Sequence, residues 1–246
     1  QLFIRIYFNL LTICLNLPLI MRSTKSNYLY NTPKLGTGIF FPKDVSIILN
    51  LPYQKVRHWI FEFWDNRFAE FGNYSFGDSK NKAIDFYTLI EFYVFYQLRS
   101  IGISAQKIQK MHKELREDLK TKYPFAHSKI STDGKNVYHE KLNNLIKIDG
   151  KKQYSFREIL EPFLTKIEYG ENNIAERFYP LSNSKNVVVD PRHQFGQPTI
   201  SGTNIKTQTI YNLYKAGESS ESISSLYNLN PSKIKDAILW HKKEAA

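Results

Sequence analysis

The side chains in this sequence that are best suited to bind a ligand lie together in residues 53–58, YQKVRH. If this stretch is helical, its polar side chains share a face that Val56 does not occupy. Arginine can donate two hydrogen bonds to guanine or hold a phosphate, and glutamine can pair with adenine. These residue types favour contact with nucleic acid, and the candidate contact residues are Gln54, Lys55, Arg57 and His58.

Two short helices are expected to position these side chains. In residues 41–63, FPKDVSIILNLPYQKVRHWIFEF, apolar residues recur at helical spacing on both sides of a break. Pro42 suits a first helical position, and Pro52 ends the first helix because it restricts the residue before it. The pattern is typical of a helix-turn-helix, whose second helix enters the major groove. An ordinary helical hairpin with a solvated basic face accounts for it equally well.

The segment that follows favours the helix-turn-helix. Glycines and an aspartate among aromatic residues predict a short hairpin over residues 68–86, which adds Lys80 and Lys82 to the candidate DNA contacts. The apolar run FYTLIEFYVFYQLRS then predicts a long helix, and Ser104 is placed to cap a further helix over residues 105–119. A helix pair, a hairpin and two more helices therefore follow one another.

This order of elements over residues 39–119 resembles the winged DNA-binding domain of the MerR family. The resemblance is sharpest in VRHW, residues 56–59, and in LRSIGISAQKI, residues 98–108. It implies DNA contact by Lys55, Arg57 and the hairpin. The sequence lacks the long coiled-coil helix and the effector-site cysteines of that family, so metal or drug sensing is not implied.

Residues 121–185 are expected to form an α+β middle segment and a linker. Two Asp-Gly pairs, each flanked by alternating apolar residues, predict two hairpins within residues 130–154. Ser155 and Glu158 have the spacing of a capping box for a helix over residues 155–166. The polar, Asn- and Ser-rich residues from 168 to 185 predict the linker.

The last sixty residues carry the most specific pattern in the chain. Two short strands, over residues 187–189 and 199–205, precede three helices that end near His241. The second helix is expected to bury Ile223, Leu226 and Tyr227. Two lysines of the last helix, Lys233 and Lys235, are further candidates for contact with phosphates, although a solvated helix face explains each of them as well.

Within this region the string DP-x4-G-x-P-x-I-x-GT resembles the small domain of the VapB-type antitoxin family, long described as a domain of unknown function. The resemblance implies a helix-turn-helix protein that binds and neutralises a toxin with a PIN-like nuclease fold. It also implies dimerisation and repression of the protein's own operon. Typical members of the family are far shorter than this chain. The matching positions are Asp190, Pro191, Gly196, Pro198, Ile200, Gly202 and Thr203.

Composition agrees with a polyanionic partner and argues against an enzyme. The formal net charge is +11, and residues 21–60 hold six lysines and arginines against Asp44 alone. The single cysteine, Cys14, excludes a disulfide framework and a thiolate zinc site. Gly-rich phosphate loops, Gly-x-Ser-x-Gly and His-Glu-x-x-His are all absent from the sequence. We therefore expect no catalytic residues, no cofactor, no metal and no small-molecule substrate.

The expected organisation has four parts. Residues 1–38 form an N-terminal segment, in which the apolar residues 1–20 are interpreted as sequence upstream of a true start at Met21. A winged helix-turn-helix over 39–120, the middle segment over 121–185 and a trihelical antitoxin-like unit over 186–246 follow. The predicted fold class is mainly α with small β hairpins.

Two functions are compatible with this organisation. The first is a cytoplasmic, homodimeric antitoxin that binds double-stranded DNA and a PIN-like toxin. The alternative is a stand-alone transcription regulator without a toxin partner. The gene beside this one would separate them, because only the antitoxin requires a neighbouring toxin.

Overall fold

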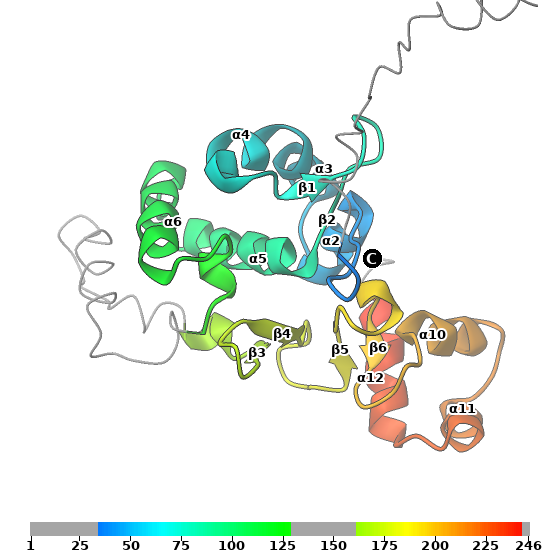
Figure 1. Cartoon of the computed structure of the whole chain (residues 1–246). Helices are drawn as coiled ribbons and strands as arrows, with labels where there is room; N and C mark the ends of the chain where they lie inside the picture. Colours follow the sequence, from blue (N-terminus) through cyan, green and yellow to red (C-terminus); the bar gives the residue numbers. More distant parts are fainter. Residues whose placement is uncertain (1–33, 129–160, 243–246) are drawn as a thin grey trace, which may run out of the picture. The chain divides into compact units, whose positions relative to one another are not determined.

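The computed structural model describes residues 34–128 and 161–242. The apolar residues 1–20, the two Asp-Gly hairpins and the start of the helix expected over residues 155–166 lie outside the described residues. Within the described part of the chain, helices predominate and the strands form three short antiparallel pairs. The predicted fold class, mainly α with small β hairpins, is confirmed (Figure 1).

The first half of the chain begins with a helix pair. Helix α2 (Pro42–Leu49) ends where Asn50 takes a left-handed conformation, with φ of 52°, and Pro52 then precedes α3 (Tyr53–His58). The chain continues through a π-helical turn, η2 (Trp59–Phe63), into α4 (Trp64–Phe68) and the 3-10 turn η3 (Ala69–Phe71). The break predicted at Pro52 is confirmed.

A hairpin and two long helices complete this half. Strands β1 (Ser75–Phe76) and β2 (Ala83–Ile84) pair antiparallel, as expected for residues 68–86. Helix α5 (Phe86–Ser100) follows, and Ser104 caps α6 (Ala105–Leu119) by accepting a hydrogen bond from the Lys107 amide at 3.3 Å. The 3-10 turn η4 (Pro124–Ala126) packs against α5. Helix α5 is apolar on nearly every side because other elements cover it, and its residues form the centre of the larger core.

The prediction of a linker over residues 168–185 is wrong for the first half of this segment. Strands β3 (Ile167–Tyr169) and β4 (Ala175–Phe178) form an antiparallel hairpin there. Phe178 is 1% exposed and its ring lies edge-on to Tyr93 of α5, with centroids 4.9 Å apart. The polar residues between the strands form the turn, and a few buried apolar residues are enough to fix the hairpin on the larger core.

The C-terminal residues form a strand pair and three helices around a second core. Strands β5 (Val187–Val188) and β6 (Thr199–Ile200) pair antiparallel, and the 3-10 turn η5 (Gln194–Gly196) lies between them. Helices α10 (Thr207–Lys215), α11 (Ser220–Tyr227) and α12 (Pro231–Lys242) follow. The core of this unit consists of Ile200, Ile210, Ile223, Ile234, Ala237 and Ile238.

The helix boundaries of this unit agree with the sequence, but one core assignment does not. Ser219 accepts a hydrogen bond from the Ser222 amide at 3.0 Å, and Asn230 accepts one from the Ser232 amide at 2.9 Å. Leu226, which was expected to be buried, is 70% exposed. With only three short helices in the unit, Leu226 lies on a side of α11 that no described element covers.

The two halves are joined through the larger core and through main-chain contacts. Trp240 of α12 belongs to the larger core, whereas the preceding turns of the same helix fill the smaller one. The Ile39 amide donates to the Phe195 carbonyl at 2.9 Å. At Gly196, where φ is +87°, a Cβ would lie 2.2 Å from the ring of Phe40. Only glycine permits this approach of the arm between β5 and β6.

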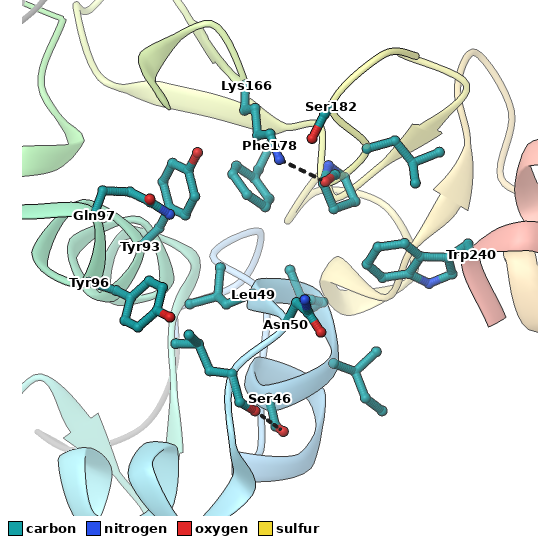
Figure 2. Close-up of a pocket in the computed structure, with 15 residues that line it drawn as sticks. Ser46, Leu49, Asn50, Tyr93, Tyr96, Gln97, Lys166, Phe178, Ser182 and Trp240 are labelled. Atoms are coloured by element: carbon teal, nitrogen blue, oxygen red, sulfur yellow. Dashed lines mark hydrogen bonds between the residues drawn. The ribbon is translucent and has the colours of Figure 1, made fainter. Parts of the chain in front are cut away.

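A cavity of about 470 Å³ lies at this junction, between α2, α5, β4 and α12 (Figure 2). Several of its polar groups are already bonded to the protein. Ser46 Oγ donates to the Leu51 carbonyl at 2.6 Å, and Lys166 Nζ donates to the Pro180 carbonyl at 3.1 Å. Tyr93 Oη donates to the Phe163 carbonyl at 3.1 Å. The cavity is therefore a packing feature of the junction, and we do not assign a ligand to it.

Candidate nucleic-acid interface

Helix α3 turns its polar side chains to solvent because its apolar side chains are fixed against α5. Val56 is fully buried, and Trp59 is 7% exposed. The Trp59 ring stands edge-on to Phe92 and Phe95, with both centroid distances 5.4 Å. Such aromatic pairs add to the burial of apolar area in holding the helix in one orientation. The other side of the helix exposes the four predicted contact residues, Gln54, Lys55, Arg57 and His58.

The hairpin and α3 converge on the ring of Phe61. The guanidinium carbon of Arg57 lies 5.0 Å from the ring centroid, and the ammonium group of Lys82 lies 5.8 Å from it. Lys82 also pairs with Asp65 of α4 at 3.6 Å and is only partly exposed. The structure therefore brings these two predicted residues together, but Lys82 already has a carboxylate partner.

The remaining charges on α3 have different surroundings. Lys55 Nζ lies 5.3 Å from the centroid of Tyr96, an arrangement that leaves its charge available to an anion. His58 Nδ1 lies 3.0 Å from a carboxylate oxygen of Glu62, one turn later. Glu62 and Asp65 therefore reduce the positive potential at the end of α3. Lys55 and Arg57 dominate the cationic face, because no carboxylate pairs with either of them in the described part of the chain.

Lys80 lies at the tip of the hairpin and is exposed to solvent. The tip is held by Asp78, whose carboxylate accepts hydrogen bonds from the Lys80 and Asn81 amides, both at 2.8 Å. These two backbone bonds lower the pKa of Asp78 below its ordinary value. The hairpin thus projects Lys80 from a defined turn.

Lys233 and Lys235 lie apart from this cluster, in the first half of α12. Lys233 Nζ donates to the Ser201 carbonyl at 2.8 Å and thereby ties α12 to the turn after β6. Lys235 is exposed. Of the two, Lys235 is the one whose charge is free of such a structural bond among the described residues.

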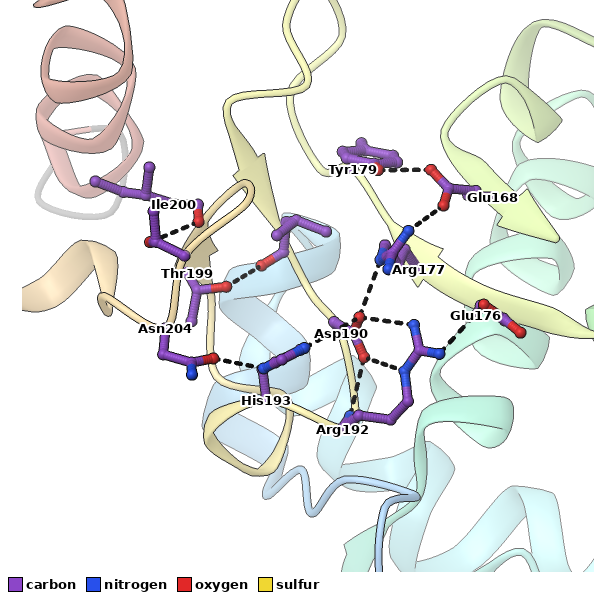
Figure 3. A network of polar contacts seen from close by, with 12 residues as sticks. Glu168, Glu176, Arg177, Tyr179, Asp190, Arg192, His193, Thr199, Ile200 and Asn204 are labelled. Carbon is purple, nitrogen blue, oxygen red and sulfur yellow. Dashed lines mark hydrogen bonds and ion pairs between the residues drawn. The ribbon is translucent and has the colours of Figure 1, made fainter. Parts of the chain in front are cut away.

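A second group of polar side chains surrounds Asp190, at the start of the C-terminal string (Figure 3). Arg177 Nε donates to Asp190 at 3.0 Å, and Arg192 donates from its amide, at 3.0 Å, and from its guanidinium. Arg177 continues to Glu168, which also accepts a hydrogen bond from Tyr179 at 2.7 Å. The motif of the C-terminal string indicates Asp190, but no sequence pattern indicates the two arginines. Arg192 occupies a variable position of that string, and Arg177 lies in the segment that was expected to be a linker.

The network around Asp190 fixes the arm rather than preparing a reaction. Burial by itself would raise the pKa of Asp190, but the hydrogen bonds from Arg192 and Arg177 outweigh burial and lower it. Every carboxylate in the network is held by an arginine or a tyrosine, which stabilises the charged form.

Among the described residues, no cluster of histidine, cysteine and carboxylate side chains could hold a metal ion. No helix of the described residues is long and apolar enough to cross a bilayer.

The C-terminal unit is similar to a family of known proteins. Residues 187–240 match the family described as "Protein of unknown function (DUF433)". This match begins at β5 and ends in α12, so it contains the strand pair, the arm with Asp190 and the three helices.

The chain is also similar to a protein called "Putative antitoxin VapB45" from Mycobacterium tuberculosis (strain ATCC 25618 / H37Rv). The two are 26% identical over 169 residues, which is 63% of this chain and 70% of that protein. Together with the DUF433 match, this similarity supports an antitoxin-like family. Because it extends well beyond residues 187–240, the likeness is not restricted to the C-terminal unit.

A solved structure shares the fold. The X-ray crystal structure of Rv2018 from Mycobacterium tuberculosis covers 84% of this chain and 100% of its own, with a TM-score of 0.65 and 20% identity. Both halves of the described chain are therefore included in the comparison. The two chains therefore share a fold that extends beyond the C-terminal unit.

Proposed function

We propose that this protein is the antitoxin of a toxin–antitoxin pair, that it neutralises a nuclease toxin with a PIN-like fold and that it represses its own operon. The observation that carries the proposal is the similarity to a protein named as an antitoxin over 63% of the chain. The C-terminal string supplies the expectation of a PIN-like partner. Autorepression would join the two activities, because the same protein would bind toxin and operator.

The N-terminal half supports the DNA-binding part of the proposal. In our interpretation α2 and α3 act as a helix-turn-helix and β1–β2 as its wing. Two observations support this assignment. Lys55 and Arg57 are exposed on α3, and the hairpin approaches α3 at the ring of Phe61. In this proposal Arg57 contacts a base or a phosphate, and Lys80 contacts a neighbouring phosphate.

Replacement of Arg57 tests the DNA-binding part. We expect Arg57→Ala to weaken binding to a duplex from the protein's own promoter by about 1–3 kcal/mol if the side chain contacts a base edge. Fluorescence anisotropy over a range of salt concentrations measures both the affinity and its salt dependence. Lys110→Ala is the matched control, since it removes one exposed charge from α6. Equal behaviour of the two variants would contradict the role of Arg57.

Co-expression with the adjacent gene tests the toxin partner. We expect the product of that gene to copurify with this protein as a stable complex and to cleave RNA when it is freed from the complex. DNA binding without a copurifying partner or a neighbouring toxin gene would instead support the stand-alone transcription regulator.

The proposed antitoxin is a homodimer. The resemblance of the C-terminal string to the VapB-type antitoxin family supports this part of the proposal, because that resemblance implies dimerisation. Light scattering on the purified protein gives its mass in solution directly, and a monomer at the concentration used for DNA binding would contradict this part of the proposal.

A further inference from the structure

A second cationic surface lies outside the α3 face, in an open groove between α2 and α10. The groove has a volume of about 640 Å³ where α3 begins, and it continues toward the N-terminus of α10 as a further hollow of about 390 Å³. The side chains that matter for the argument are Lys43, Tyr53, Lys206, Gln208, Tyr211 and Lys215.

Three lysines determine the charge of this groove. Lys43 and Lys215 are exposed, and Lys206 is partly exposed. In the described part of the chain, no carboxylate lies within ion-pair distance of any of the three. Asp44 also lines the groove, but its carboxylate accepts a hydrogen bond from the Phe41 amide at 2.9 Å and caps α2. The groove therefore has a net positive charge and can receive an anion.

The groove is continuous with the candidate DNA-contacting helix. Tyr53 lines it and is also the first residue of α3, two residues before Lys55. A strand of anionic groups that passes α3 can therefore continue into the groove without leaving the protein surface. Lys43 comes from α2, whereas Lys206 and Lys215 lie at the two ends of α10, so the surface exists only when the two halves of the chain pack together.

The chemistry of the groove suits a phosphodiester backbone better than the edges of bases. Lysine presents a flexible point charge with no fixed hydrogen-bonding pattern, so it holds phosphates without selecting a sequence. The groove is open rather than enclosed, as a continuous polymer requires.

We propose that the α2–α10 groove binds the phosphodiester backbone of the same DNA duplex that α3 contacts, through Lys43, Lys206 and Lys215. This inference rests on the proposed DNA-binding function and extends it to the C-terminal unit. The N-terminal half then supplies the contacts that can discriminate between bases, and α10 supplies contacts that position the duplex. Both halves of the chain form one binding surface.

The double variant Lys43→Gln/Lys215→Gln tests the groove in the full-length protein. Each phosphate contact that is lost should reduce the slope of log affinity against log salt by about one, so we expect a reduction of about two. Affinity should fall by the same factor for the promoter duplex and for a mixed-sequence duplex of about 30 base pairs, since the contact carries no sequence information. The control Lys107→Gln/Lys110→Gln removes two exposed charges from α6 and should leave the slope unchanged.

The possible results separate this inference from the function on which it rests. If Arg57→Ala weakens binding while the groove variant keeps the wild-type affinity and slope, the groove proposal is overturned and DNA binding by α3 stands. If the wild-type protein binds neither duplex, both are overturned. If the groove variant binds DNA normally but no longer copurifies with the toxin, the groove binds a protein partner, which also overturns the proposal. Unchanged thermal unfolding of the variants shows that any effect is not a loss of folding.

Discussion

Two carboxylates with almost no solvent exposure meet opposite surroundings in this protein. Glu91 of α5 is fully buried and faces His112 of α6, with 2.9 Å between Oε2 and Nε2. Burial raises the pKa of Glu91, although the nearby His112 lowers it in part. Asp190 is 2% exposed, yet two arginines overcome the effect of burial and lower its pKa. Burial thus favours the protonated acid at Glu91, whereas Asp190 is charged at neutral pH.

We expect Glu91→Ala to reduce the free energy of unfolding by about 1–3 kcal/mol for each buried hydrogen-bonding group that it leaves without a partner, and the His112 ring is one of these groups. It also removes the acceptor of the Phe125 amide, which lies 2.8 Å from Oε1. Glu91→Gln keeps a carbonyl oxygen for that amide and should cost much less. Urea unfolding of the two variants at neutral pH measures the difference, and equal losses would show that only the charge matters.

The pH dependence of these variants gives a second test of the same site. A carboxyl whose pKa is raised by folding stabilises the native state at low pH, and this contribution is lost as the pH rises through the folded-state pKa. The glutamine side chain of Glu91→Gln does not titrate, so this variant should not lose stability in this way as the pH rises. Its stability relative to the wild type should therefore increase as the pH rises from 4 to 8.

Asp190→Asn should behave in the opposite way. The neutral amide leaves Arg177 and Arg192 without their common carboxylate, and we expect a loss of about 2 kcal/mol at pH 7. A carboxyl whose pKa is lowered by folding stabilises the protein above its ordinary pKa, and this contribution is lost as the pH falls through the folded-state pKa. The difference between wild type and variant should therefore shrink below about pH 4. A difference that stays constant down to pH 2 would argue against the ion pairs.

At the scale of elements, the helices could be predicted well from local signals. Pro52 separates α2 from α3, and Ser104, Ser219 and Asn230 begin helices as their types indicate. The inward face of α12 was also predicted correctly, since Ile234, Ala237, Ile238 and His241 are all buried. Exposure of the polar side of α3 follows from the same periodicity.

The errors arise where tertiary packing decides the outcome. Helical spacing predicts that Leu226 is buried, but only a partner element can cover it, and the described chain provides none. Residues 168–185 contain many polar side chains, which conceal the buried residues Ala175, Phe178 and Tyr179. The pairing of Lys82 with Asp65 depends on how the hairpin lies against α4, and no sequence pattern indicates that.

The contact between the arm and the first half of the chain can be isolated with two glycines. Gly196 and Gly217 both have positive φ, of +87° and +104°, so alanine strains the backbone at either position. Only at Gly196 would the new Cβ meet a ring, that of Phe40, whereas nothing lies within 4 Å at Gly217. We expect Gly196→Ala to be more destabilising than Gly217→Ala by at least about 1 kcal/mol, measured by thermal unfolding. Equal losses would mean that the arm can move away from Phe40.

At the scale of the whole molecule, the candidate site depends on how distant segments meet. The cationic face of α3 lies within one short stretch and could be predicted from it. The α2–α10 groove combines Lys43 with Lys206 and Lys215 from a distant part of the sequence, and no motif or spacing links the first lysine to the other two. The similarity to Rv2018 over 84% of the chain indicates that the packing of the two halves is a property of the shared fold.

Helix α12 belongs to two cores at once, because Ile234 and Ile238 fill the smaller one while Trp240 fills the larger. A change that loosens either core should therefore also destabilise the other, because both cores pack against the same helix. The C-terminal unit should not melt as an independent foldon, even though its own apolar centre is complete. A fragment limited to residues 187–240 would expose the Trp240 indole to water, because the core against which it packs would be missing. We expect such a fragment to aggregate.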